Sequence, residues 1–363
     1  MPALYCAPPA RDLKKERERS MTDLPHVLHL VDDATPGGVN RVLQHIRTCP
    51  MMARSARHSL HVVSRKGALP ICDADMIVSH LSLSWRRLPA LIAFRARHAS
   101  KPLVHVEHSY TEAFTALNVP SKLRFFTMLR TSLALFDSVV AVSHAQAEWM
   151  KRRRLVSPDA LRIIAPVVDL QDFRSIEAAT RKPQVIGAIG RLHRQKGFDI
   201  LIRAFRKLPN KDASLHIHGT GPEETELRAL AAGDRRIRFF GHSDSPDREM
   251  RSVDFVAIPS RWEAFGLVAL EARAAGRPVI CSNIDGLKTS AGAEATFVAG
   301  HSETAWAKAL AAAFEVNPAI RSPERACDCE RTFAFAWSRL IAHHIGFHST
   351  KSSAESFTRE ASV

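Results

Sequence analysis

Two short segments in the second half of the sequence place charged residues beside glycines where a strand pattern gives way to a helix pattern. The first is the loop Gly190–Gly197, with sequence GRLHRQKG, which carries Arg191 and Lys196. Two cations beside a helix N-terminus can bind a diphosphate. Preorganised cations there would stabilise the charge on a departing nucleoside diphosphate without a metal. Taken alone, the loop is explained equally well as a solvated basic turn.

The second segment is Ser260–Ala272, with sequence SRWEAFGLVALEA. Gly266 stands where the next helix should begin, so backbone amides there can approach an anion closely. We expect Glu263 in the loop, facing a cleft, and Glu271 inside the helix among apolar neighbours. A carboxylate on so apolar a helix needs a partner. A ribose with two adjacent hydroxyls is one such partner, and a buried salt bridge is the alternative.

Alternating strand and helix patterns surround these segments and predict an α/β fold. A strand at His26–Val31, a turn with Gly37 and Gly38, and a helix pattern from Val39 to Ile46 open a doubly wound sheet. Further strands of the first half are expected at 60–63, 76–80, 102–107 and 138–142, with helices at 88–99 and 121–136. A second alternation has strands at 184–190, 214–218, 237–240, 255–259 and 278–281, the last of which is expected to complete the domain. Its expected helices lie at 198–208, 223–232 and 267–275.

The sequence therefore predicts two Rossmann-like parallel-sheet domains that face a central cleft, where ligands of such sheets bind. The N-terminal domain is expected at 23–173 and the C-terminal domain at 184–330, joined by a polar linker at 174–183. A helix at 331–347 could cross back to the N-terminal domain. Residues 1–22 are expected to be a disordered leader, or an artefact of start-codon choice before Met21, and 348–363 a disordered tail.

Composition and charge narrow the class of protein. The 363 residues contain no apolar run long enough to span a membrane, no signal-peptide pattern, and six scattered cysteines that we expect to be free thiols in the cytosol. Of the formal net charge of +14, most lies in the first half: residues 21–165 hold 19 Lys and Arg against 10 Asp and Glu. An excess of positive charge favours the binding of phosphate groups or anionic lipid. Nucleic acid is a weaker candidate, because no nucleic-acid-binding motif is present.

Together, the two segments resemble the large retaining glycosyltransferase family 4. Also similar are IPS before Glu263, EARAAGRPVICSN from Glu271 onward, and the turn Gly219–Pro222; the resemblance covers residues 27 to 347. It implies the GT-B fold, a nucleotide-sugar donor (UDP-, GDP- or ADP-sugar), no metal or other cofactor, and retention of the anomeric configuration. The sequence departs from the family at Asn283–Gly286, where two glycines are usual, and in the bulky Arg261 and Trp262, which could shape sugar specificity.

The resemblance also implies roles for individual residues. Arg191 and Lys196 would hold the donor diphosphate, Glu271 the ribose and Glu263 the hydroxyls of the donor sugar. Backbone amides would assist at Phe265, Gly266 and Leu267. In the first half, Gly38 matches the family's glycine loop near the donor and acceptor, and His108 falls where the family has a histidine near the reacting sugar. A histidine there can donate to the sugar or orient the acceptor, although a lone loop histidine is more often an ordinary surface group.

The basic first half suggests a second surface. The stretches 85–97 and 122–130 interleave basic and apolar residues, a pattern typical of helices that lie on an anionic membrane and also of helices whose apolar face is core. We thus expect a cytoplasmic enzyme that transfers sugar to a saccharide or lipid-linked acceptor in cell-surface polysaccharide or lipopolysaccharide synthesis. If the two helices lie on a membrane, the enzyme would be peripheral to its cytoplasmic face. The other interpretations are a GT-B nucleotide-sugar epimerase and a non-catalytic sugar-nucleotide binder.

Overall fold

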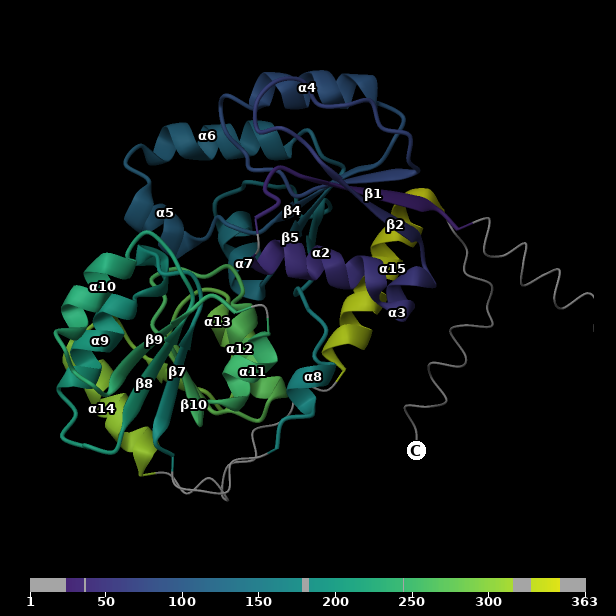
Figure 1. The fold of residues 1–363 in the computed structure, drawn as a ribbon. Helices are drawn as coiled ribbons and strands as arrows, with labels where there is room; N and C mark the ends of the chain where they lie inside the picture. Colours follow the sequence, from purple (N-terminus) through teal and green to yellow (C-terminus); the bar gives the residue numbers. More distant parts are fainter. Residues whose placement is uncertain (1–23, 36, 178–182, 244, 316–327, 347–363) are drawn as a thin grey trace, which may run out of the picture.

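The computed structural model consists of two α/β lobes, each built on one sheet (Figure 1). It describes residues 24–35, 37–177, 183–243, 245–315 and 328–346. The expected leader at 1–22 and tail at 348–363 lie outside these residues, and so do residues 178–182 of the expected linker at 174–183. The α/β fold predicted from the sequence is confirmed.

The N-terminal lobe contains a six-stranded sheet with the order β2-β1-β3-β4-β5-β6, in which all neighbouring strands are parallel. Its strands are β1 (His26–Val31), β2 (Arg57–Val62), β3 (Met76–Ser79), β4 (Leu103–Glu107), β5 (Ser138–Ala141) and β6 (Leu161–Ile163). The central strands β3, β4 and β5 are buried along their whole length, because helices cover both faces of a parallel sheet. The short edge strand β6 was not expected from the sequence.

Helices of the N-terminal lobe are α2 (Gly38–Thr48), α3 (Pro50–Ala53), α4 (Leu88–Arg97), α5 (Glu112–Asn118), α6 (Lys122–Leu133) and α7 (His144–Arg152). The sequence reading missed α5 and α7. Each has a side-chain cap at its start: Thr111 accepts from the amide of Phe114, and Ser143 accepts from the amide of Gln146. Such caps satisfy amides that the first helical turn leaves without a partner.

The C-terminal lobe repeats the architecture, with a parallel sheet in the order β12-β11-β10-β7-β8-β9. Its strands are β7 (Val185–Ile189), β8 (Ser214–His218), β9 (Ile237–Gly241), β10 (Phe255–Ile258), β11 (Val279–Ser282) and β12 (Thr296–Val298). The expectation that the strand at 278–281 completes this domain is wrong. Strand β12 adds to the sheet beside β11, and helix α14 follows it and buries Trp306 against the lobe's core.

Helices after β6 are α8 (Gln171–Arg174), the 3-10 helix η1 (Arg194–Lys196), α9 (Phe198–Arg206), α10 (Glu224–Ala231), α11 (Pro246–Arg251), α12 (Leu267–Ala274), α13 (Leu287–Ser290), α14 (Glu303–Phe314) and α15 (Cys329–Ile345). The last of these returns to the N-terminal lobe, where it packs on α3 and β3 (Figure 1). It buries an apolar face there that includes Phe333, Trp337 and Ile341. The N-terminal core therefore needs residues from the end of the chain.

Two further expectations concern the cysteines and membrane spans. The cysteines at 49, 72 and 281 are free thiols, as expected. Among the helices of the described part of the chain, none is both long and apolar enough to cross a bilayer.

Candidate active site

The loop after β7 carries Arg191 and Lys196 at the carboxyl end of the C-terminal sheet. Gly190 and Gly197 both have positive φ, which lets the loop turn tightly between β7 and α9. A Cβ at Gly197 would lie 2.1 Å from the carbonyl oxygen of Pro259. Only glycine therefore lets this loop pack directly against the end of β10, and the two segments singled out in the sequence come together.

Further contacts tie the two segments to each other. The amide of Arg261 donates to the carbonyl oxygen of Gln195 at 2.7 Å, and its guanidinium forms a two-pronged ion pair with Asp199 at 2.8 and 2.7 Å. Burial raises the pKa of the Asp199 carboxyl, but the hydrogen bonds and charge of Arg261 outweigh it and hold that pKa below its usual value. Arg261 thus joins two loops, and its role in sugar specificity stays a prediction.

The two cations of the first loop stand in different surroundings. Lys196 forms an ion pair with Glu263, with Nζ 2.7 Å from Oε2, and both side chains are largely buried. Ser260 donates to the same carboxylate oxygen at 3.2 Å. Arg191 is exposed and forms no ion pair within the described residues. One cation is therefore held in place, while the other is available to a ligand.

Helix α12 begins at the predicted glycine. Gly266 is its N-cap with φ of 93°, and a Cβ there would meet Leu287 at 2.6 Å. The amides of Phe265, Gly266 and Leu267 donate no hydrogen bond within the described part of the chain. Unbonded amides at a helix start, together with the helix dipole, favour an anion.

Glu271 is 1% exposed and lies one turn farther along α12. Its Oε1 accepts a hydrogen bond from Nη1 of Arg41 at 2.6 Å, and Arg41 belongs to α2 of the other lobe. Burial raises the pKa of Glu271, whereas the charges of Arg41 and Lys196 lower it. In this structure the partner of Glu271 is therefore Arg41, in a buried ion pair. Such a pair was the alternative to a ribose in the sequence analysis. Sequence reasoning did not identify Arg41.

Gly38, at the start of α2, lies against the same site. A Cβ on Gly38 would be 3.1 Å from Cδ1 of Leu267, so the two residues face each other across the junction of the lobes. Asp285, in the segment that departs from the family pattern, accepts a hydrogen bond from the hydroxyl of Thr111 at 2.8 Å. The unusual Asn283–Gly286 loop thus joins the C-terminal lobe to the start of α5. Trp262 is buried and packs edge-on against Phe114 of α5.

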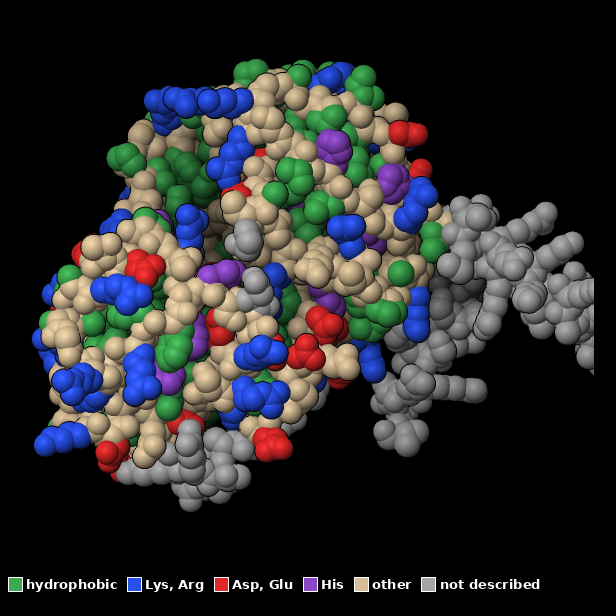
Figure 2. Space-filling view, viewed as in Figure 1, with side chains coloured by type: hydrophobic (Ala, Val, Ile, Leu, Met, Phe, Trp, Pro, Cys, Tyr) green, Lys and Arg blue, Asp and Glu red, His purple; other side chains and the backbone are tan. Residues whose placement is uncertain are grey.

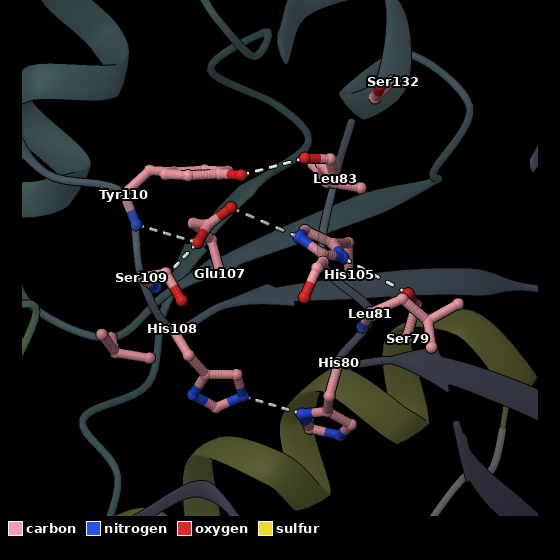
Figure 3. A network of polar contacts seen from close by, with 12 residues as sticks. Ser79, His80, Leu81, Leu83, His105, Glu107, His108, Ser109, Tyr110 and Ser132 are labelled. Carbon is pink, nitrogen blue, oxygen red and sulfur yellow. Dashed lines mark hydrogen bonds and ion pairs between the residues drawn. The ribbon is translucent and has the colours of Figure 1, made fainter. Parts of the chain in front are cut away.

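His108 follows β4 and is linked to a neighbouring histidine (Figure 3). Its Nε2 lies 2.8 Å from Nδ1 of His80, and burial lowers its pKa to about 4 despite the opposing charge of Glu107. The turn around it is fixed because Glu107 accepts from the amides of Ser109 and Tyr110. Within the described residues, no hydrogen bond or ion pair joins His108 to the charged groups of the C-terminal lobe.

Comparison with known proteins places the chain in a family. Residues 6–172 match the family described as Glycosyltransferase Family 4, and residues 183–315 match Glycosyl transferases group 1. The chain belongs to glycosyltransferase family 4. It is a glycosyltransferase of GT-B fold, which confirms the resemblance read from the sequence.

Curated relatives include two bacterial D-inositol 3-phosphate glycosyltransferases. The protein from Saccharomonospora viridis is 29% identical over 296 residues, which are 73% of this chain and 67% of that protein. The protein from Corynebacterium glutamicum is 34% identical over 208 residues, which are 49% of each chain. The matches thus span about half to two thirds of the length of these relatives.

Solved structures share the fold of this glycosyltransferase at low identity. Anabaena HepE in complex with UDP and glucose has a TM-score of 0.64 at 19% identity, covering 89% of this chain and 99% of that one. WaaG, a glycosyltransferase involved in lipopolysaccharide biosynthesis, has a TM-score of 0.60 at 18% identity, covering 88% and 100%.

Proposed function

We propose that this chain is a retaining, metal-independent glycosyltransferase that moves a sugar from a nucleotide-sugar donor to a saccharide or lipid-linked acceptor. The observation that carries the proposal is the pairing of Lys196 and Arg41 with the carboxylates of Glu263 and Glu271 beside the unbonded amides of α12, with Arg191 exposed on the same loop as Lys196. A nucleotide sugar has the complementary features in the same molecule: an anionic diphosphate flanked by ribose and sugar hydroxyls.

The diphosphate is assigned to the cationic side of this site. Arg191 and Lys196 would bind its oxygens, and the amides at Gly266 and Leu267 would donate to them at the positive end of α12. As the bond to the sugar breaks, negative charge grows on the departing diphosphate. Donors held in place beforehand stabilise that charge without reorganising.

The two carboxylates are assigned to hydroxyls. In Glu271 the Arg41 bond uses Oε1, and in Glu263 the bonds from Lys196 and Ser260 use Oε2. The other oxygen of each carboxylate accepts no side-chain hydrogen bond within the described residues. Oε2 of Glu271 would therefore take a ribose hydroxyl, and Oε1 of Glu263 a hydroxyl of the donor sugar.

We propose one chemical step that would use these positions. The bond from the anomeric carbon to the phosphate oxygen breaks, and the acceptor oxygen forms its bond on the same face of the sugar. The acceptor's hydroxyl proton passes to the departing phosphate oxygen. His108, at the carboxyl end of β4, would contact the sugar, and Gly38 would leave space where the lobes meet. The acceptor would lie against the N-terminal lobe.

We also propose that the N-terminal lobe rests on the anionic cytoplasmic face of a membrane during polysaccharide or lipopolysaccharide synthesis. The inner faces of α4 and α6 are core, with Phe94 and Leu129 buried. Their outer faces nevertheless carry exposed apolar side chains, Ile92 at 49% and Leu123 at 79%. Lys and Arg side chains lie over the same helices at the top of the lobe (Figure 2). Apolar insertion flanked by basic residues is how interfacial helices bind anionic lipid.

Donor binding is the first test. Thermal unfolding is followed with a panel of UDP-, GDP- and ADP-sugars, because a ligand at about 100 times its Kd stabilises the folded state by about 2.7 kcal/mol. At least one nucleotide sugar should raise the Tm by about 5 °C or more. The transfer assay then uses saccharides, lipid-linked saccharides and D-inositol 3-phosphate as acceptors. The last is included because curated relatives are named D-inositol 3-phosphate glycosyltransferases.

Variants test the site. Arg191→Ala and Glu271→Ala should lower turnover at least 100-fold, the scale on which single transition-state donors act. Arg235→Ala is the matched control, since this exposed arginine precedes β9 at the opposite end of the sheet. Wild-type turnover in both site variants would refute the assignment. A changed nucleotide sugar as product would indicate epimerisation, and binding without any product would indicate a non-catalytic binder.

A further inference from the structure

A row of four histidines crosses the N-terminal sheet, one from each of four adjacent strands or strand ends. His58 lies on β2, His29 on β1, His80 directly after β3 and His108 directly after β4. Hydrogen-bond distances join them in order: His58 Nδ1 to His29 Nε2 at 3.0 Å, His29 Nδ1 to His80 Nε2 at 3.0 Å, and His80 Nδ1 to His108 Nε2 at 2.8 Å. We call these four residues the histidine row.

The register of the sheet explains how the row forms. His58 pairs with Val27, two residues before His29 on β1, and His29 pairs with Val78, two residues before His80. Each step from one strand to the next therefore advances two residues toward the carboxyl ends. Because side chains alternate between faces, steps of two keep the rings on one face. The row runs diagonally from the start of β2 to His108 at the carboxyl end of β4.

Its surroundings keep the rings neutral near pH 7. His29 is 1% exposed, and Trp337 of α15 packs edge-on against it. Burial lowers the pKa of His29 and His80 well below the ordinary value, and that of His58 and His108 to about 4. Nearby charged or titratable groups are Arg47 at His29, His26 at His58, His105 at His80, and Glu107 with His105 at His108.

A neutral imidazole has one N–H and one bare nitrogen. Each bond of the row joins Nδ1 of one ring to Nε2 of the next, so the tautomer of each ring determines the tautomer of its neighbour. Either all four carry the proton on Nδ1, or all four carry it on Nε2. The tautomer of His108 is therefore tied to that of His58 on the far side of the sheet.

The two ends of the row decide between these states. Nε2 of His58 is buried and has no hydrogen-bond partner among the described residues. With protons on Nε2, His58 would bury an N–H without an acceptor, which is rarer in proteins than an acceptor without a donor. With protons on Nδ1, His108 presents an N–H from the ring edge that points away from His80 (Figure 3).

We propose that the histidine row fixes His108 as an Nδ1–H hydrogen-bond donor toward the cleft, with His80, His29 and His58 as positioning residues. The inference rests on the proposed function for its catalytic meaning, because the acceptor of that N–H would be an oxygen of the donor sugar. A ring fixed in this way donates to the sugar and does not act as a general base.

¹⁵N NMR of the histidine rings determines the tautomers directly. The full chain is labelled with ¹⁵N in its histidine rings, and ring nitrogen shifts are recorded at pH 7.5. The four rings of the row should each show a protonated Nδ1 and a bare Nε2. A protonated Nε2 at His108, or a mixture of both forms, would overturn the proposal. This measurement needs no variant and no activity, so it stands even if the proposed transfer reaction is never found.

His80→Met then removes the N–H that His108 Nε2 accepts. His108 should show both tautomers, and kcat should fall about tenfold with a smaller change in KM, the scale set by ordering one side chain. His98→Met is the control, because His98 is another buried histidine, hydrogen-bonded to Cys72 and Phe94 outside the row. It should leave the His108 shifts and kcat unchanged. An unchanged kcat in His80→Met would refute the positioning role.

Discussion

The ion pair between Arg41 and Glu271 links the two lobes, and its removal should weaken the protein in a pH-dependent way. Arg41→Met keeps most of the side-chain length and removes the charge. Losing one partner of a buried pair costs about 3–5 kcal/mol. Arg41 is 34% exposed and Lys196 also acts on Glu271, so solvent and a second cation reduce this figure. We expect a loss of about 2–3 kcal/mol in the free energy of unfolding at pH 8.

The sign of the pH dependence follows from the carboxyl group. Burial holds the pKa of Glu271 above its ordinary value of 4.5 in the folded chain. A raised carboxyl pKa means that the folded state binds the proton more tightly, so stability falls as pH rises from the unfolded to the folded pKa. Without Arg41 the folded pKa rises further, because the carboxylate loses its nearest positive charge. The cost of Arg41→Met should therefore be near zero below pH 4.5 and grow toward pH 8.

Urea unfolding at pH 5 and pH 8, followed by both tryptophan fluorescence and far-UV circular dichroism, measures this cost and shows whether the lobes unfold together. Arg47→Met is the control, since Arg47 is an exposed arginine on the same helix. A double-mutant cycle with Glu271→Gln should give a coupling of about 2 kcal/mol at pH 8. An equal cost of Arg41→Met at both pH values, or a coupling below about 0.5 kcal/mol, would refute the reasoning.

Two further predictions concern the helix start and the membrane surface. Gly266→Ala should lower the free energy of unfolding by about 1–3 kcal/mol. The loss should exceed that of Gly300→Ala, because both glycines have positive φ but only Gly266 faces a close side chain. Equal losses of the two variants in urea unfolding would contradict this. Leu123→Ser should weaken cosedimentation with anionic vesicles about tenfold, since a buried leucine contributes about 1.5–3 kcal/mol. Phe335→Ser, at an exposed position of α15, should not, and equal binding of both variants would contradict the membrane proposal.

Local signals in the sequence predicted the fold and both C-terminal segments. A glycine after a strand marked the start of α12, because a positive φ there has few other solutions. Helix α7 was missed although its start carries such a signal, since Ser143 followed three residues later by Gln146 is a capping pattern. Strand β12 carries no such signal, because three residues between loops give too little periodicity to separate a strand from coil.

Partners far apart in the chain could not be predicted. Arg41 and Glu271 are 230 residues apart, and nothing in either segment indicates the other. The histidine row depends on the strand order β2-β1-β3-β4 and on a register that advances two residues at each step. A shift of one residue in any strand would turn that ring to the opposite face. His108 could be singled out from sequence, but its neighbours His80, His29 and His58 could not.

The charge of the assembled site is consistent with the ligand that we propose. Two ion pairs, Arg41 with Glu271 and Lys196 with Glu263, neutralise four charges and leave Arg191 unpaired within the described residues. A further carboxyl, Glu249, is buried nearby, and its pKa is raised to about 7 by burial and by the charge of Glu271. Because Glu249 therefore adds less than a full negative charge near neutral pH, the site keeps a positive surplus from Arg191 and from the start of α12. A diphosphate matches that surplus, whereas a neutral saccharide would leave it uncompensated.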